Sequence, residues 1–111
     1  MDDLLEKIKP RAKQHTPHFL MLFGSRARAT AGPESDWDFG YLADKGFDSD
    51  PLYLELVLLL KTDKVDLVDL SKANASLRFR ATQDGKLIVE NRSGTYFRFL
   101  FTLPSLESAS P

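Results

Sequence analysis

The stretch that decides the fold runs from Phe19 to Leu42 with the sequence FLMLFGSRARATAGPESDWDFGYL. Its first five residues, Phe19 to Phe23, form a continuous apolar run, which is typical of a strand buried on both faces. Gly24 and Ser25 then predict a turn into a short helix over 26–29, followed by a loop over 30–35. From Asp36 to Leu42 the large aromatic residues alternate with smaller or acidic ones, which predicts a second strand.

The rest of the chain predicts two further strands and several helices that complete one domain over residues 1–103. The apolar positions from Asp2 to Gln14 recur at helical spacing, although Pro10 implies a kink or a later start. The architecture expected is α/β (α+β): a mixed sheet of about four strands, packed against helices on one side. The other expected elements are helices at 51–61, 71–83 and 94–103, strands at 64–70 and 86–90, and a flexible tail at 104–111.

Composition and charge exclude several classes of protein. The chain has 111 residues, no cysteine and a formal net charge of −1, so disulfide frameworks and thiolate chemistry are excluded. The near-neutral charge also argues against duplex nucleic acid as a stable partner. No apolar run is long enough to span a membrane, and the acidic amino-terminal residues do not form a secretory signal. We therefore expect a cytoplasmic protein.

Two aspartates on the second predicted strand suggest the chemistry. Asp36 and Asp38 are two residues apart, so on a strand they share a face and can bind hard cations such as Mg²⁺. Two such ions activate an attacking oxygen and stabilise a leaving pyrophosphate. Gly24 and Ser25 complete the requirement, because a glycine and free N–H groups allow a triphosphate to approach closely. The spacing therefore predicts nucleotidyl transfer from a nucleoside triphosphate.

Further charged residues are candidates for the same site. Arg26 or Arg28 would offset the charge of the triphosphate. A third carboxylate is expected on a neighbouring strand, where Asp66 and Asp69 are the candidates in the sequence KVDLVDL. Residues three apart face opposite sides of a strand, so only one of them can serve. Asp66, in the strand centre, is favoured, and Asp69 remains the alternative.

Three other conspicuous residues are interpreted structurally. His15 and His18 flank the first strand without the spacing that metal ligands need, so both are expected at the surface or at the end of an element. Trp37 lies between the two aspartates and must point to the opposite face, where core packing is expected.

The sequence GSRARATAGPESDWDF resembles the minimal nucleotidyltransferase (MNT) branch of the polymerase-β-like superfamily. The later stretches VDLVDL and LRFRATQDGKLIVE are similar to the strand, helix and strand that follow in that family, so the resemblance covers residues 17–90. It implies the nucleotidyltransferase fold, and an antitoxin that transfers AMP from ATP to a tyrosine hydroxyl of a partner HEPN RNase toxin. By position, Gly24 and Ser25 would hold the triphosphate, Asp36 and Asp38 the Mg²⁺ ions, and Asp66 the acceptor hydroxyl.

Two alternative functions remain open at this point. One is a nucleotidyltransferase that acts on a small molecule or an RNA end, although a chain of this length has little room for an acceptor-binding domain. The other is a non-catalytic antitoxin that neutralises its toxin by binding. A variant that keeps the fold but lacks Asp36 distinguishes a binder from an enzyme.

Overall fold

The structure is a computed structural model that describes residues 2–28 and 30–101. Ala29, which ends the expected short helix, lies outside the described residues. The same holds for residues 102–103 of the last expected helix and for the expected tail over 104–111.

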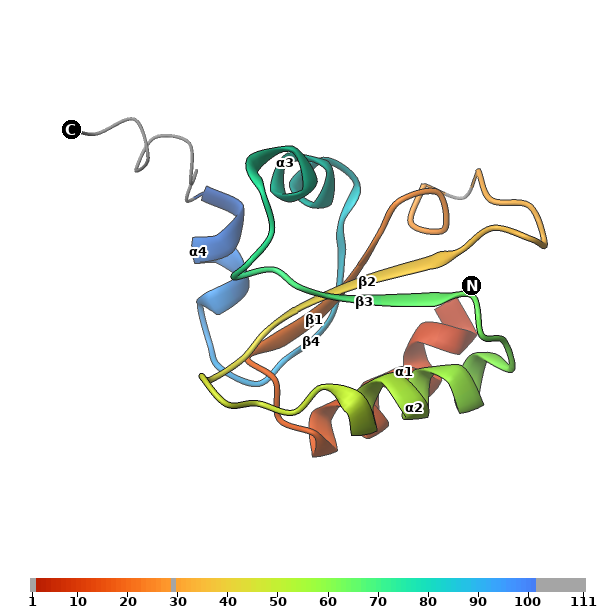
Figure 1. The fold of residues 1–111 in the computed structure, drawn as a ribbon, viewed down its shortest axis with the longest axis horizontal. Helices are drawn as coiled ribbons and strands as arrows, with labels where there is room; N and C mark the ends of the chain where they lie inside the picture. The colour runs from red at the N-terminus through yellow and green to blue at the C-terminus, as the bar shows by residue number, and fades with distance from the viewer. Residues whose placement is uncertain (1, 29, 102–111) are drawn as a thin grey trace.

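A four-stranded mixed sheet lies at the centre of the molecule, in the order β3-β2-β1-β4 (Figure 1). β1 pairs antiparallel with β2 and with β4, whereas β2 and β3 run parallel. The predicted strand number and the mixed character are therefore confirmed. The strands are β1 Phe19–Phe23, β2 Trp37–Leu42, β3 Val65–Asp69 and β4 Lys86–Glu90.

Helices cover both faces of this sheet, which corrects the expectation that they lie on one side. α1 and α2 lie below the sheet in Figure 1, and α3 and α4 lie above it. The four described helices are α1 Asp2–Gln14, α2 Asp50–Leu60, α3 Ala75–Asp84 and α4 Thr95–Phe101. None of the described helices is long and apolar enough to cross a membrane.

The burial of β1 explains why two layers of helices are needed. All five of its residues are buried, as the continuous apolar run predicts. Alternate side chains point to opposite faces of a strand. Leu20 and Leu22 therefore join the core under α1 and α2, while Phe19, Met21 and Phe23 join a second core with residues of α3 and α4. A strand that is apolar on both faces requires a cover on each.

Two element boundaries differ from the sequence-based expectations near the Gly-Ser turn. β2 begins at Trp37, so Asp36 lies just before the strand rather than in it. Residues 25–28 form a hydrogen-bonded turn, in which the Gly24 carbonyl accepts from the N–H groups of Ala27 at 3.1 Å and Arg28 at 3.2 Å. With so few backbone hydrogen bonds this segment is not a regular helix.

Candidate active site

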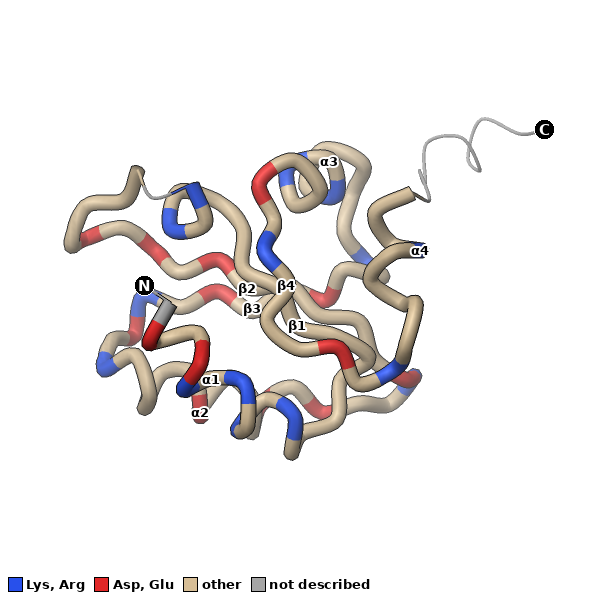
Figure 2. Tube along the Cα trace, turned by 180° about the vertical axis from the view of Figure 1, so that it is seen from behind, with Lys and Arg blue, Asp and Glu red and all other residues tan. Residues whose placement is uncertain are grey.

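The strand register brings the predicted aspartates together at one end of the sheet. In β2, Asp38 lies opposite Phe23, the residue before Gly24, and on its other side it pairs with Asp66 of β3. Side chains at paired positions on neighbouring strands project from the same face. Asp36 precedes β2 by one residue. Figure 2 shows acidic positions gathered where β2 and β3 begin.

Gly24 lies directly against the carboxylate of Asp38. A Cβ atom at Gly24 would lie 2.5 Å from Asp38 Oδ2, closer than real Cβ contacts come. Gly24 also has a φ of +75°, a conformation that side chains disfavour. Glycine is therefore required here for two independent reasons, and the first of them, the steric one, shows that the turn contacts the carboxylate.

The pKa of Asp38 reflects the two carboxylates near it. Burial raises the pKa of Asp38 above its usual value of 3.8, and the negative charges of Asp66 and Asp36 raise it further. The positive charge of Arg80 acts in the opposite direction with a smaller effect. Accumulated negative charge of this kind is expected where a protein binds a cation.

Asp66 and Asp69 have different environments, as expected from their opposite directions along β3. Asp69 Oδ1 accepts hydrogen bonds from the Ser71 N–H at 3.0 Å and from the Ser71 hydroxyl at 2.7 Å. It thus stabilises the turn after β3, whereas Asp66 lies beside Asp38. The geometry favours Asp66 as the third carboxylate, and its role in the reaction stays a prediction.

The Gly-Ser turn keeps backbone donors available next to these carboxylates. Within the part of the chain that the structure describes, no backbone carbonyl accepts a hydrogen bond from the amide of Ser25 or of Arg26. Successive free amides in a turn form a concave site that suits phosphate oxygens. This arrangement agrees with the prediction that Gly24 and Ser25 hold a triphosphate.

The two arginines predicted to contact the triphosphate are bound elsewhere. The Arg26 guanidinium donates through Nη2 to the Ser35 carbonyl at 2.9 Å, and its Cζ lies 4.4 Å from the centre of the Trp37 ring. Arg28 forms an ion pair with Asp84, with Nη1 2.9 Å from Oδ2. Arg26 therefore supports the loop before β2, and sequence alone gave no signal for that contact. Arg28 is half exposed and must leave Asp84 to reach a phosphate.

The three carboxylates are ligands of the type that Mg²⁺ prefers, although they do not converge on a single point. The three carboxylates supply the oxygen ligands that hard cations prefer, and their mutual repulsion is relieved by a bound cation. Among residues 2–28 and 30–101, however, no three His, Cys, Asp or Glu side chains converge closely enough to hold an ion as they stand. Mg²⁺ sites commonly involve only one or two carboxylates, with waters and substrate phosphates supplying the rest.

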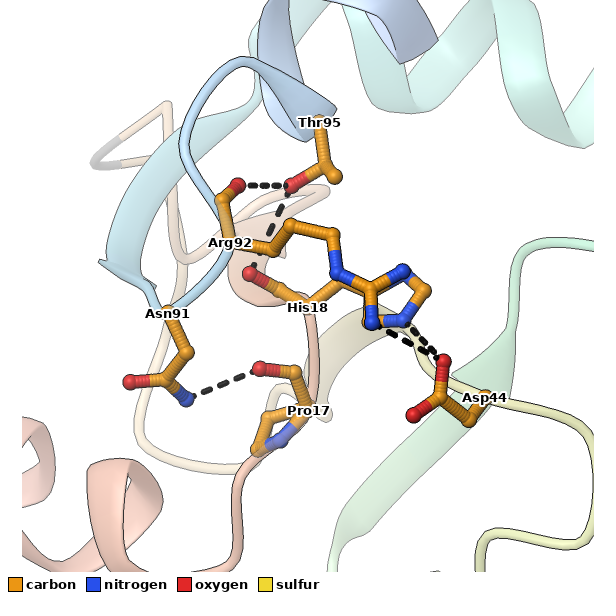
Figure 3. Close-up of polar contacts among 6 residues, drawn as sticks. All are labelled: Pro17, His18, Asp44, Asn91, Arg92 and Thr95. Atoms are coloured by element: carbon orange, nitrogen blue, oxygen red, sulfur yellow. Dashed lines mark hydrogen bonds and ion pairs between the residues drawn. The ribbon is translucent and has the colours of Figure 1, made fainter.

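The opposite end of the sheet carries a second polar cluster, which the sequence did not predict. His18 Nε2 lies 2.8 Å from Asp44 Oδ1, and Arg92 donates to the same oxygen at 3.2 Å (Figure 3). Asn91 donates to the Pro17 carbonyl at 2.8 Å. His18 thus lies at the end of an element, as predicted. His15 is likewise near a carboxylate, with Nε2 3.7 Å from Glu55 Oε1.

Comparison with known proteins gives one family for most of the chain. The family model described as polymerase beta, nucleotidyltransferase, matches residues 6–93. A curated relative, the protein adenylyltransferase MntA of Aphanizomenon flos-aquae (strain 2012/KM1/D3), is 29% identical over 92 aligned positions, and the match covers 72% of this chain. The chain spans 61% of the length of that relative.

Solved structures show the same fold. A chain in the crystal structure of a toxin-antitoxin with AMP-PNP is 26% identical, with a TM-score of 0.70; the match covers 96% of this chain and 86% of that one. A chain in the structure of tri-AMPylated Shewanella oneidensis HEPN toxin in complex with MNT antitoxin is 25% identical, with a TM-score of 0.68 and the same coverage of 96% and 86%. The similarity in fold therefore extends well beyond the aspartate motif.

Proposed function

This chain belongs to the polymerase beta nucleotidyltransferase family, and from that premise we propose that it is an antitoxin that transfers AMP from ATP to a tyrosine hydroxyl of a HEPN RNase toxin. The observation that carries the proposal is the contact of the Gly24 turn with the carboxylate of Asp38, which lies beside Asp66. The partner and the acceptor follow the relatives, one named as a protein adenylyltransferase and another solved with a tri-AMPylated HEPN toxin. The proposal places the chain in the cytoplasm.

The Gly-Ser turn binds and orients the nucleotide in this proposal. The free amides of Ser25 and Arg26 donate to phosphate oxygens, and the Ser25 hydroxyl adds a donor. Because Gly24 has no side chain, the turn that holds the triphosphate lies directly against Asp38. The turn thereby fixes the α-phosphate beside the carboxylates, and this orientation lowers the entropic cost of reaching the transition state.

The three carboxylates organise the transfer itself. Asp36, Asp38 and Asp66 would hold two Mg²⁺ ions, which when bound supply Lewis acidity and neutralise charge on the phosphates. The tyrosine oxygen attacks the α-phosphorus of ATP, the new O–P bond forms, and the bond to the bridging oxygen breaks to release pyrophosphate. A tyrosine hydroxyl has a pKa of about 10, so its proton must be removed. Asp66 orients that hydroxyl or accepts its proton.

The test is the intact mass of the HEPN-type protein encoded beside this chain, after incubation with the chain, ATP and Mg²⁺. We expect the mass to increase by one or more adenylyl units. The matched control is Asp36→Asn with Asp38→Asn, two changes that remove charge without altering side-chain size, and it should give no increase.

A second candidate is an antitoxin that acts by binding alone, which is supported by the similarity to chains solved in toxin-antitoxin structures. The same experiment separates the two functions. A toxin that gains no mass, but is still neutralised by the double variant, would leave the binding function and refute transfer.

A further inference from the structure

We propose that Arg26 is a positioning residue that holds Asp36 in place for the cation, and that it does not bind the triphosphate. The inference rests on the proposed function, because it assigns Asp36 to the metal site. Asp36 is the carboxylate in need of such support. Asp38 and Asp66 are fixed within β2 and β3 by strand pairing, whereas Asp36 lies before β2, at the end of the loop that follows the Gly-Ser turn.

Arg26 contacts the backbone immediately before Asp36. Its Nη2 donates to the carbonyl of Ser35 at 2.9 Å and lies 3.5 Å from the carbonyl of Pro33. The Ser35 carbonyl belongs to the peptide bond that joins Ser35 to Asp36, so this hydrogen bond fixes the orientation of that peptide plane. A charged donor makes the bond stronger than a neutral one.

Arg26 also contacts the residue immediately after Asp36. Its guanidinium lies over the Trp37 ring, with 4.4 Å from Cζ to the ring centre. Trp37 is only 6% exposed, and its backbone N–H donates to the Lys64 carbonyl at 2.8 Å. Burial and this hydrogen bond hold the residue in place, so the ring provides a fixed surface. The guanidinium is partly desolvated, since the Arg26 Nε is buried and finds no hydrogen-bond partner among the described residues, while the residue as a whole is only partly buried. Desolvation strengthens the cation–π attraction.

These contacts need a guanidinium and not merely a positive charge. A planar group can stack on an aromatic face and donate in its own plane to the Ser35 carbonyl at the same time. A lysine ammonium has the same charge but lacks the plane, so it cannot reproduce both contacts. Arg26→Lys therefore separates the two possible roles. It should preserve a purely electrostatic contact with phosphate and impair the positioning of Asp36.

The experiment measures binding of Mn²⁺, as a probe for Mg²⁺, to the full chain in the presence of ATP, together with the fluorescence of Trp37. Trp37 is the single tryptophan of the chain, so its quenching by acrylamide reports directly on the Arg26 contact. We expect Arg26→Lys to weaken Mn²⁺ binding about tenfold, the size typical of losing a group that orients a metal ligand. Acrylamide quenching of Trp37 should increase, while ATP affinity in EDTA should stay within about twofold of wild type.

Two further variants complete the design. Arg92→Lys makes the same chemical change at the opposite end of the sheet, where the guanidinium contacts Asp44, and it should leave Mn²⁺ binding unchanged. Arg26→Ala should weaken Mn²⁺ binding at least as much as Arg26→Lys; if the alanine variant does not fold, the lysine variant alone decides.

The inference is overturned if Arg26→Lys binds Mn²⁺ like wild type, or if its loss appears in metal-free ATP affinity, which would place Arg26 on the triphosphate. It is also overturned if the wild-type chain with ATP binds no Mn²⁺. A wild-type chain that shows Arg26-dependent Mn²⁺ binding but transfers no AMP would refute the proposed function and leave the positioning role standing.

Discussion

The two ends of the central sheet carry charged side chains in opposite ways. At the end where β2 begins, the carboxylates of Asp36, Asp38 and Asp66 lie near one another, and their repulsion and burial raise the pKa of Asp38. At the other end, one carboxylate, Asp44, is bonded to His18 and Arg92, and its pKa is lowered, first by the His18 hydrogen bond and then by the Arg92 charge.

The difference separates charge that stabilises the fold from charge that we propose binds a cation. Asp44, in the segment after β2, contacts His18 at the start of β1 and Arg92 in the segment after β4. Its charge therefore stabilises contacts within the protein. The charge of Asp38 works against folding, although the positive charge of Arg80 offsets part of this effect, and a bound cation would relieve it further. Four predictions test this contrast, in order of decreasing effect.

Asp38→Asn should have the largest effect and should separate activity from stability. Loss of a carboxylate that holds a catalytic cation removes several kcal/mol of transition-state stabilisation, so AMP transfer should fall about 10³-fold or more. Stability should not fall. Because the pKa of Asp38 is raised in the folded state, the ionised carboxylate opposes folding. This destabilisation is absent below pH 3.8, where Asp38 is protonated in both states, and it is fully present once the pH has risen through the folded pKa.

The melting temperature and the transfer rate of the same Asp38→Asn preparation check this pair of expectations. The variant should melt at or above the wild-type temperature at neutral pH. A lower melting temperature would show that Asp38 stabilises the fold and would remove the contrast between the two ends.

Asp66→Asn and Asp69→Asn should differ although both lie on β3. Asp66 is proposed to act on the acceptor hydroxyl, so its replacement should slow transfer about 10²-fold. Asp69 accepts its hydrogen bonds from Ser71, and the neutral side-chain oxygen of an asparagine accepts such bonds more weakly, so its replacement should cost at most about 1 kcal/mol of stability and little activity. Rates and chemical denaturation of the two variants measure this, and a greater loss of activity with Asp69→Asn would reverse the assignment.

Gly24→Ala and Gly46→Ala form a matched pair for the contact with Asp38. Both glycines have positive φ, +75° and +89°, so each alanine should cost about 1 kcal/mol in backbone strain. Only at Gly24 would the added Cβ meet Asp38 Oδ2, whereas nothing lies within 4 Å of a Cβ at Gly46. Transfer should therefore fall about tenfold with Gly24→Ala beyond any effect of unfolding, and stay near wild type with Gly46→Ala. Equal activity in both would remove the steric argument.

Asp44→Asn should give the smallest effect, confined to the pH dependence of stability. Because the pKa of Asp44 is lowered in the folded state, its ionised carboxylate stabilises the fold above pH 3.8. This contribution to stability disappears as the pH falls through the folded pKa. The variant should melt slightly below wild type at neutral pH, and the gap should close in acid. A gap that widens in acid would contradict this assignment.

The regular elements were predictable from the sequence because local patterns determine them. The apolar run Phe19–Phe23 and the stretch Lys86–Glu90 were both expected as strands and form β1 and β4. The second layer of helices was missed because the partners of Phe19, Met21 and Phe23 come from α3 and α4, distant in sequence. The paired positions of Asp38 and Asp66 follow from the parallel register, which spacing along the chain does not contain.

The contacts of Arg26 and Arg28 could not be predicted from the sequence for a related reason. The GSRAR motif predicts either Arg26 or Arg28 as a phosphate ligand and does not distinguish them, because both follow the same turn. Only the folded chain brings Arg26 to Ser35 and Trp37, and Arg28 to Asp84, which is 56 residues away in sequence. Contacts made only in the folded chain therefore determine the partners of both arginines.

Labelled ATP tests the central claim most directly, because the position of the label identifies the group transferred. The chain is incubated with Mg²⁺, the HEPN-type partner, and ATP that carries radioactive phosphorus at either the α or the γ position. We predict that the α label appears on the partner and the γ label does not, and that Asp36→Asn with Asp38→Asn abolishes the transfer. A γ label on the partner, or an α label that survives the double variant, would contradict nucleotidyl transfer at these carboxylates.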